Sequence, residues 1–351
     1  MREIRDRAKP RMKAFCRVCK ICDGRACAGE IPGMGGIGTG ASFKNNVAAL
    51  AAIRLNMRLI HGVTAPRAET SLFGMPLALP ALAAPIGGVA VNMDLGVPEE
   101  EYDEAVVAGC LEAGTLACTG DGVQPRIHEA AFAAIRRHGG AAIPFIKPWE
   151  GPELAEKLEK ARDAGCKAVG VDIDAAGLLT LRQKGKPVAP RTPEELSRII
   201  DLVHGWGLRF ILKGLMTPKD AVLAVNAGAD AVAVSNHGGR ALDHLPGTAE
   251  VLPAIARAVD GKAVVIADGG VRDGADVLKM LALGADLVLI GRPVTVAAVG
   301  GGGEGVARYF TLLKDQLLQA MIMTGVADAT AVDGSILFDR PSGPPSRPDA
   351  G

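Results

Sequence analysis

A histidine and an arginine follow a strongly apolar run in the second half of the chain. The run "AVAV" at 231–234 leads into "SNHGGRALD", which places His237 and Arg240 on either side of two glycines. Imidazole exchanges protons near neutral pH, and a guanidinium binds a carboxylate or a phosphate with two hydrogen bonds. Glycine has no Cβ and allows a tight turn or close approach to a ligand. An ordinary strand-to-loop turn has the same pattern, so its interpretation depends on the surrounding residues.

Other polar residues end or directly follow short apolar runs. Asp172, Lys213, Asp268 and Arg292 all occupy such positions. Segments with a helical pattern separate the runs, and several of these end in related sequences, "EAGTLA", "DAGCKAV", "NAGADAV" and "ALGADLV", whose glycine suits a left-handed helix terminus. The apolar runs, which we interpret as strands, are 77–83, 115–119, 141–146, 168–173, 210–213, 231–235, 263–267 and 287–290.

Eight strands that alternate with helices predict a parallel sheet, and eight is the number that closes a (β/α)8 TIM barrel. An open doubly wound sheet is the alternative. No GxGxxG follows the first strand, however, and the polar residues lie at the ends of many different strands. Those ends converge on one catalytic face in a barrel. We therefore predict an α/β protein in which residues 71–337 form the barrel, residues 1–70 a cysteine-containing extension and residues 338–351 a disordered tail.

Composition narrows the class of protein. The 351 residues are 48% hydrophobic and carry a formal net charge of zero, which argues against a nucleic-acid partner. Ser71 to Met93 is uncharged and long enough to span a bilayer, but Pro76, Pro80 and Pro85 interrupt it, so we predict a buried strand with turns and no membrane span. The basic N-terminus lacks the apolar core of a signal peptide, and we expect a cytoplasmic protein.

Four of the seven cysteines lie in "CRVCKICDGRAC". Cys16, Cys19, Cys22 and Cys27 have a C-x2-C-x2-C-x4-C spacing, which allows thiolates to converge on one metal centre. An iron–sulfur cluster, a zinc ion and unmetallated thiols are all compatible with this spacing. Cys110, Cys118 and Cys166 are expected to be buried barrel residues.

Several segments together resemble a known family. "ILKG" at 211–214, "SNHGGRALD" at 235–243, "DGGVRDGADVLKMLALGAD" at 268–286 and "IGRP" at 290–293 are similar to the FMN-dependent α-hydroxy-acid oxidases and dehydrogenases, a family that includes glycolate oxidase, lactate oxidase and flavocytochrome b2. The resemblance is strong from about residue 205 to 337, and weaker but continuous from about 40 to 204.

The resemblance implies roles for individual residues. His237 would be the catalytic base, Asp172 would orient its imidazole, and Arg240 would bind the substrate carboxylate. Lys213 would lie beside N1 and O2 of the flavin, where reduction places negative charge. The remaining flavin contacts that it implies are Ala84, Pro85, Ile86, Thr119, Ser235, Asp268, Gly269, Gly270, Val271, Arg272, Gly291 and Arg292.

The chain departs from the family at the substrate side. The family has one tyrosine before the barrel and another at the end of strand three, but neither Tyr102 nor Tyr309 occupies these positions, and Lys147 lies near the second. The family's second carboxylate-binding arginine, after strand four, has no clear match. Lys147 is therefore a candidate substrate ligand, and we expect oxidation of a 2-hydroxy acid other than glycolate or lactate to a 2-oxo acid.

Two further functions remain open from the sequence. One is a non-redox FMN enzyme of the type-2 isopentenyl diphosphate isomerase kind, and the other is a non-catalytic sensor that binds flavin or metal. If the cysteines hold an iron–sulfur cluster near the flavin, an electron-carrier protein becomes the expected acceptor in place of O2. We also expect the protein to form a homo-oligomer.

Overall fold

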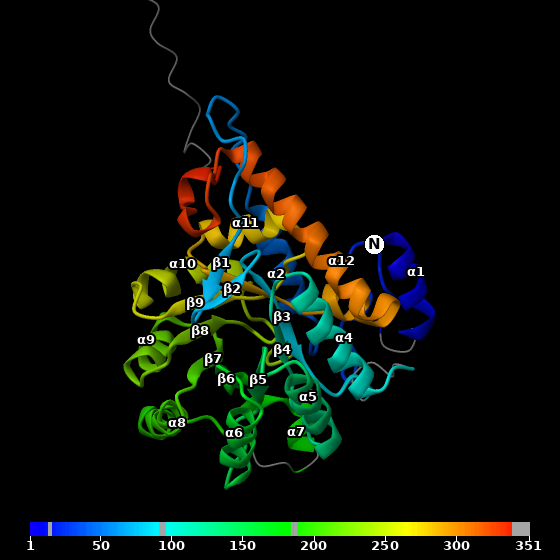
Figure 1. The fold of residues 1–351 in the computed structure, drawn as a ribbon, viewed down its shortest axis with the longest axis vertical. Coiled ribbons are helices and arrows are strands. Elements are labelled where there is room, and N and C mark those ends of the chain that lie inside the picture. Colours follow the sequence, from blue (N-terminus) through cyan, green and yellow to red (C-terminus); the bar gives the residue numbers. More distant parts are fainter. Residues whose placement is uncertain (13–15, 91–95, 184, 186–187, 339–351) are drawn as a thin grey trace, which may run out of the picture.

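Eight parallel strands close into a barrel that is surrounded by helices in the computed structural model of the chain (Figure 1). The structure describes residues 1–12, 16–90, 96–183, 185 and 188–338, so the predicted tail lies outside the described residues except for residue 338. The strand order around the barrel follows the chain, and β10 pairs with β3 to close it. The predicted (β/α)8 barrel is confirmed.

The barrel strands agree with the predicted runs to within a few residues, apart from the first. Their bounds are β3 (Ala81–Ile86), β4 (Ala117–Thr119), β5 (Ala142–Ile146), β6 (Ala168–Asp172), β7 (Arg209–Leu215), β8 (Ala231–Val234), β9 (Val264–Ala267) and β10 (Leu287–Ile290).

The predicted first strand, 77–83, spans two different elements. Residues up to Leu77 belong to an antiparallel hairpin of β1 (Thr70–Leu72) and β2 (Met75–Leu77), which turns at Gly74 with a φ of 78°. Pro80, which has no amide hydrogen, separates this hairpin from β3. The barrel strand therefore starts four residues later than the apolar run suggests.

The hairpin covers one end of the barrel interior. Leu72, Met75 and Leu77 are buried together with side chains that point into the barrel, including Leu82 and Phe145. A second and larger core lies between the outer faces of the strands and the helices. The hairpin closes the end opposite to the C-terminal ends of the strands, where catalytic residues collect in this architecture.

Helices connect the strands and form the outer layer (Figure 1). Gly114, Gly165, Gly228 and Gly284 follow four of them with φ between 73° and 105°, as the repeated helix-end sequences predict. The outer helices are α4 (Glu99–Glu112), α5 (Pro125–Arg137), α6 (Glu153–Asp163), α7 (Leu179–Gln183), α8 (Pro193–Gly205), α9 (Pro218–Asn226), α10 (Thr248–Val259), α11 (Gly274–Ala282) and α12 (Arg292–Thr324), and short 3-10 turns are η1 (Ile173–Gly177), η2 (Ala329–Ala331) and η3 (Gly334–Ile336).

The N-terminal extension packs on the barrel rather than away from it. Helix α1 (Arg2–Arg11) lies along α12, so closely that a Cβ at Gly300 would collide with the backbone of Ile4 (Figure 1). Helix α2 (Ala41–Ala52) packs against α10. Between them the chain crosses to the barrel mouth, where the Ile37 amide donates to the Gly239 carbonyl at 2.9 Å. The extension therefore contributes to the catalytic end of the barrel.

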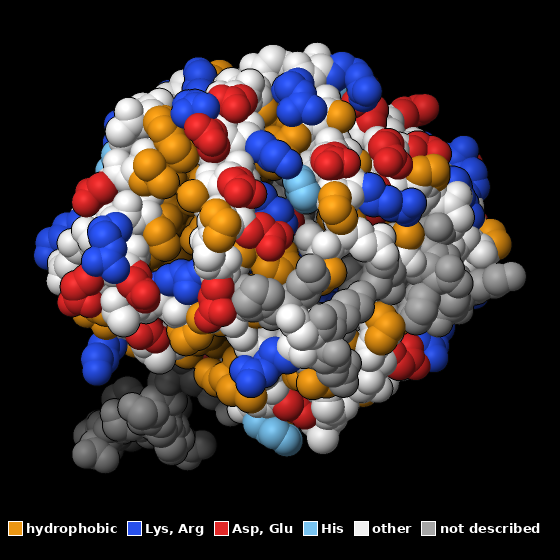
Figure 2. Space-filling model, turned by 90° about the horizontal axis from the view of Figure 1, so that it is seen from below, with side chains coloured by type: hydrophobic (Ala, Val, Ile, Leu, Met, Phe, Trp, Pro, Cys, Tyr) orange, Lys and Arg blue, Asp and Glu red, His pale blue; other side chains and the backbone are white. Residues whose placement is uncertain are grey.

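The surface carries charges of both signs (Figure 2), in keeping with the net charge of zero. Figure 2 shows Lys and Arg side chains interspersed with Asp and Glu over the face that it presents. Within the described part of the chain, no helix combines the length and the apolar character that crossing a bilayer requires. The described part of the uncharged stretch from Ser71 forms the hairpin and β3, as predicted.

Candidate active site at the barrel mouth

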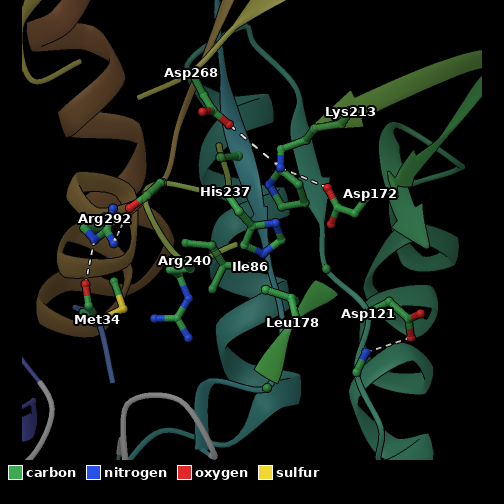
Figure 3. Close-up of a pocket in the computed structure, with 18 of the residues that line it drawn as sticks. Met34, Ile86, Asp121, Asp172, Leu178, Lys213, His237, Arg240, Asp268 and Arg292 are labelled. Carbon is green, nitrogen blue, oxygen red and sulfur yellow. Dashed lines mark hydrogen bonds and ion pairs between the residues drawn. The ribbon is translucent and has the colours of Figure 1, made fainter. Parts of the chain in front are cut away.

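A cavity of about 300 Å³ opens at the C-terminal ends of the barrel strands. Residues within or just after all eight strands contribute to its wall, so the structure brings together the polar strand ends that the sequence singled out. Figure 3 shows His237, Lys213 and Arg240 directed into this cavity. The lining residues predicted from the sequence are Ala84, Pro85, Ile86, Lys147, Asp172, Lys213, His237, Arg240, Asp268, Gly269, Gly270, Val271, Arg272, Gly291 and Arg292.

His237 forms a hydrogen bond with a carboxylate other than the one that the family resemblance implies. The His237 Nδ1 lies 3.0 Å from Oδ1 of Asp174, whereas Asp172 forms an ion pair with Lys213. Asp172 also has a carboxylate oxygen within 4.8 Å of a ring nitrogen of His237, so its role in orienting the imidazole stays a prediction, with Asp174 as the direct hydrogen-bond partner. Strand β6 ends at Asp172 and the chain enters η1, a turn that directs Asp174 toward the ring.

This contact fixes which nitrogen of the imidazole can act as a base. Burial disfavours the charged form of Asp174, but the charges of His237 and Lys213 outweigh burial and lower the pKa of Asp174 below its usual value. An ionised Asp174 accepts a hydrogen bond from Nδ1–H, which leaves Nε2 of the neutral ring as the proton acceptor. The backbone of His237 has a φ of 57°, and its amide donates to Ser235 Oγ at 3.1 Å.

Lys213 is a buried cation between two carboxylates (Figure 3). Its Nζ lies 3.0 Å from Asp172 Oδ1 and 3.9 Å from Asp268 Oδ2. Burial by itself would lower the pKa of Lys213, but the three aspartates Asp172, Asp174 and Asp268 outweigh burial and raise it. Lys213 therefore supplies a permanent positive charge at the cavity wall.

Two predicted flavin contacts lie behind this wall. Ser235 is fully buried and its hydroxyl donates to Asp268 Oδ2 at 2.7 Å. Thr119 is also buried, and its hydroxyl has no hydrogen-bond partner in the structure. Neither residue lines the cavity. Ser235 acts on the cavity through Asp268 and the His237 amide instead.

Arg240 and Arg292 connect the mouth to the N-terminal extension. Arg240 donates to the Gly33 carbonyl, and Arg292 donates to the carbonyls of Met34 at 2.8 Å and Gly238 at 2.9 Å. Burial lowers the pKa of each guanidinium to about 10, at which both remain charged at neutral pH. The two arginines thus hold the 33–35 backbone over the cavity while they line it.

Asp121 is a site residue that the sequence interpretation missed. It follows β4, lines the cavity and accepts hydrogen bonds from Trp149 Nε1 at 2.6 Å, Lys157 Nζ at 2.8 Å and the Lys147 amide at 3.1 Å. These bonds fix the start of the loop after β5, from which Lys147 lines the cavity. The sequence pattern that could have identified Asp121 is "TGDG" at 119–122, in which an acidic residue lies between two glycines at a strand end.

Apolar residues complete the wall of the cavity. Ile31, Met34 and Ile37 come from the extension, and Leu178 and Leu181 come from the segment after β6. No tyrosine lines the cavity in the part of the chain that the structure describes: Tyr102 bonds Thr295 at 3.1 Å, and Tyr309 donates to the Arg272 carbonyl at 3.3 Å.

The four N-terminal cysteines do not form a compact single-ion site. Over the described residues, the set of three potential metal ligands whose donor atoms lie within 4.8 Å of one another is Asp172, Asp174 and His237, and no three of Cys16, Cys19, Cys22 and Cys27 meet this limit. All four thiols are free and partly exposed.

The cavity fits an FMN. Ala84, Pro85 and Ile86 offer an apolar surface for a planar ring, and Gly291 lies beside them, where a Cβ would be 3.4 Å from Ile86 Cδ1 and 3.7 Å from Ala84 Cβ. Lys213 provides a cation, and Arg272 carries a buried Nε–H that has no hydrogen-bond partner. Such a donor suits an anionic group such as a phosphate.

Comparison with known proteins agrees with this geometry. A family model described as FMN-dependent dehydrogenase matches residues 33–197 and 190–339. An L-lactate oxidase of Lacticaseibacillus rhamnosus is 34% identical over 82% of this chain and 83% of its own length, and a peroxisomal (S)-2-hydroxyacid oxidase of Arabidopsis thaliana is 30% identical over 81% and 84%.

A solved structure of a mandelate oxidase variant with 2-hydroxy-phenylacetamide superimposes with a TM-score of 0.76 and 30% identity, over 96% of this chain and 97% of that one. The family match, the relatives and the geometry of the mouth lead to one conclusion: the chain belongs to the FMN-dependent hydroxy-acid oxidases and dehydrogenases.

Proposed function

We propose that this enzyme oxidises a 2-hydroxy acid larger than glycolate or lactate to the corresponding 2-oxo acid. One observation carries the proposal: His237, held by Asp174 at 3.0 Å, shares a single cavity with Arg240, Lys147 and Lys213. A base, two cations for an acid and a third cation for the cofactor are the groups that this oxidation requires.

Different residues of the chain would transfer the proton and bind the substrate carboxylate. His237 Nε2 takes the proton from the substrate while Asp174 stabilises the imidazolium that forms. Arg240 and Lys147 bind the carboxylate, and Arg240 can do so as a planar fork. FMN, when bound, accepts the two electrons that the substrate loses.

The residues that would hold FMN line the same mouth. Ala84, Pro85 and Ile86 would contact the ring, Lys213 would lie beside its N1 and O2, and Arg272 with Arg292 would hold the phosphate at the loops after β9 and β10. Loops after the last two strands are the usual phosphate site of such barrels.

The size of the substrate follows from the apolar wall. Ile31, Met34, Leu178 and Leu181 line the cavity with apolar side chains. These side chains offer no hydrogen bond to a small hydroxy acid. Burying apolar surface stabilises a complex by roughly 25 cal/mol per Å². A substrate with a bulky apolar substituent gains from this wall, whereas glycolate has no substituent to place there.

The test is anaerobic reduction of the bound flavin by a panel of 2-hydroxy acids of increasing size, measured by stopped-flow bleaching. Wild type should be reduced rapidly by larger apolar acids and slowly by lactate and glycolate. His237→Ala should reduce flavin at least about a hundredfold more slowly, which is the scale for losing a general base, and still contain FMN. Arg240→Met should weaken substrate binding.

The outcomes separate the alternatives. Rapid reduction by glycolate or lactate would contradict the substrate class, and an unimpaired His237→Ala would contradict the mechanism. A flavin that no 2-hydroxy acid reduces would favour the non-redox enzyme or the sensor. An electron-carrier acceptor and a homo-oligomer stay predictions, to be checked by reoxidation of the reduced protein under O2 and by light scattering.

A further inference from the structure

The Asp121 carboxylate joins three elements at the barrel mouth. Its Oδ2 accepts hydrogen bonds from the Lys147 amide at 3.1 Å and from Trp149 Nε1 at 2.6 Å, both in the loop after β5. Its Oδ1 accepts from the Gly122 amide at 2.7 Å, in the loop after β4, and from Lys157 Nζ at 2.8 Å, on helix α6. A carboxylate has about four acceptor positions, so Asp121 keeps none for a substrate proton. Its bonds make it an anchor for its neighbours.

A buried ion pair forms the centre of this anchor. The Asp121 side chain is fully buried, and the Lys157 side chain is 5% exposed. Lys157 Nζ also lies 2.9 Å from a Glu153 carboxylate oxygen and 4.3 Å from the centre of the Trp149 ring. Apolar side chains in place of a buried ion pair often give equal stability. We therefore interpret the pair as a means of specifying one conformation of the loop after β5.

The backbone of that loop has a partner at each polar group from Lys147 to Trp149. Besides the amide bond already described, the Lys147 carbonyl accepts from the Trp149 amide at 2.8 Å. The Pro148 carbonyl accepts from the Ala189 amide at 3.2 Å and from Arg191 at 3.1 Å, and Arg191 also donates to the Trp149 carbonyl. Pro148 disfavours a helical backbone for the residue before it. These contacts fix the point from which the Lys147 side chain leaves the backbone.

The Lys147 side chain extends from this fixed backbone to line the cavity. Its ammonium forms no hydrogen bond or ion pair with the residues that the structure describes. Its charge nevertheless helps to lower the pKa of Asp174, the hydrogen-bond partner of His237. Lys147 is therefore a cation near the proposed base to which no carboxylate of the described chain is directly bound.

We propose that Asp121 is the positioning residue for Lys147, and that it holds the loop after β5 so that the Lys147 ammonium meets the substrate carboxylate. Lysine is a point charge on a flexible stem, and ordering it costs conformational entropy. A fixed backbone lowers that cost. Figure 3 shows Asp121 apart from His237 and Lys213, so it acts on the substrate side of the cavity. This inference rests on the proposed function, which assigns Lys147 to the carboxylate.

The experiment measures benzoate binding to the FMN-loaded full chain by the change in flavin absorbance. Benzoate has a carboxylate and an apolar ring but no hydroxyl, so it binds without being oxidised. Lys147→Met should weaken binding at least about tenfold, the scale for losing one hydrogen bond to a charged group. Asp121→Asn should weaken it by a similar factor. In the Lys147→Met background, Asp121→Asn should add less than about twofold, because both changes remove the same contact.

A second variant and a control accompany Asp121→Asn. Trp149→Phe removes one hydrogen bond to Asp121 but keeps the ion pair with Lys157, so it tests the proposal even if Asp121→Asn folds poorly. It should weaken benzoate binding only when Lys147 is present. Glu153→Gln removes the other carboxylate partner of Lys157, at a side chain that is 39% exposed, and should bind benzoate like wild type. FMN content and melting temperature report that each variant is folded.

Three results would overturn the proposal: a wild type that does not bind benzoate, an Asp121→Asn variant that binds it like wild type, and a weakening that persists in the Lys147→Met background. Anaerobic flavin reduction by a 2-hydroxy acid then separates positioning from a general structural role. Asp121→Asn should raise the acid concentration for half-maximal rate and keep the limiting rate within about twofold, whereas general damage would lower both the rate and the FMN content. If the benzoate results hold and no acid reduces the flavin, the proposed oxidation fails and the role of Asp121 stands.

Discussion

Asp172 and Asp174 are two residues apart and have different partners. Substituting each in turn therefore tests which carboxylate assists His237. Asp172 is the last residue of β6 and is paired in register with Lys213 on β7. Asp174 lies in the turn that follows and reaches His237. Residues two apart in a strand would point to the same face, so it is the turn η1 after Asp172 that gives the two carboxylates different partners.

Asp174→Asn should slow flavin reduction by substrate at least about tenfold, because a neutral amide neither fixes the tautomer nor stabilises the imidazolium; the same change in a Ser-His-Asp triad costs up to about 10⁴. The loss should appear in kcat with little change in KM. Asp172→Asn is the matched variant. If Asp172→Asn is the one that loses the fast step while Asp174→Asn keeps it, the role assigned from the family resemblance is right and the geometric one is wrong.

Lys213 leads to a prediction about the cofactor. Replacing it with Met should lower the two-electron reduction potential of bound FMN by about 30 mV or more, equivalent to about 1.4 kcal/mol, because the cation that stabilises reduced flavin is lost. Lys213→Arg keeps the charge and should keep most of the potential. A Met variant with wild-type potential, measured by dye equilibration, would remove Lys213 from this role.

At the scale of elements, one carboxylate ties the extension to the catalytic loop. Asp243, just after the His-Gly-Gly-Arg sequence, accepts hydrogen bonds from the Thr39 hydroxyl at 2.9 Å and from the Ala41 amide at 2.9 Å, at the start of α2. Burial alone would raise the pKa of Asp243, but these bonds and those of the Thr39 and His244 amides outweigh it and lower the pKa from 3.8 to about 2.

The sign of the pH effect follows from that shift. A carboxyl with a depressed pKa stabilises the folded state fully above its unfolded value, and this contribution is lost as pH falls from about 4 to 2. Asp243→Asn should therefore destabilise the protein at pH 7 by about 2 kcal/mol, the scale for hydrogen bonds to a charged group, and should flatten the acid limb of the stability curve. Urea unfolding at pH 7 and at pH 3 measures both.

Asp201→Asn, at an exposed position of α8, is the matched control and should leave the curve unchanged. Equal stability of the Asp243→Asn and wild-type proteins at pH 7 would show that the hydrogen bonds of Asp243 do not contribute to holding the extension.

At the scale of the whole molecule, the extension and the loops after β9 and β10 meet at one rim, so a ligand there links the N-terminal and C-terminal parts of the chain. Met34 lies against Arg292, and Arg272 contacts the cysteine segment. A ligand that binds only the folded state stabilises it by about 2.7 kcal/mol at one hundred times its Kd.

FMN at that excess should raise the Tm of flavin-free protein by about 5 °C, given roughly 2 °C per kcal/mol for a chain of this size. Riboflavin, which lacks the phosphate, should give a clearly smaller shift, because Arg272 and Arg292 have no anion to bind. Differential scanning calorimetry with both ligands measures this, and shifts of equal size would place the phosphate away from these arginines.

The sequence by itself determined the architecture. Eight apolar runs, helices ending in glycine, and polar residues at strand ends are local patterns, and the C-terminal ends of parallel strands in a barrel necessarily meet at one face. His237, Lys213 and Asp268 could therefore be assigned to one mouth without coordinates, and the structure places all three on its cavity. The cysteine spacing was equally visible, although it did not choose between metals.

Only the tertiary structure decided which side chains meet across elements. The hydrogen bond of Asp174 to His237, the bond of Asp121 to the Lys147 amide, and the extension as one wall of the cavity all depend on side-chain direction and on contacts between residues far apart in the chain. The first strand was misplaced for a related reason, since an apolar run has the same pattern in a hairpin as in a barrel strand. Hydrophobic periodicity records that a residue is buried, but not which partner it is buried against.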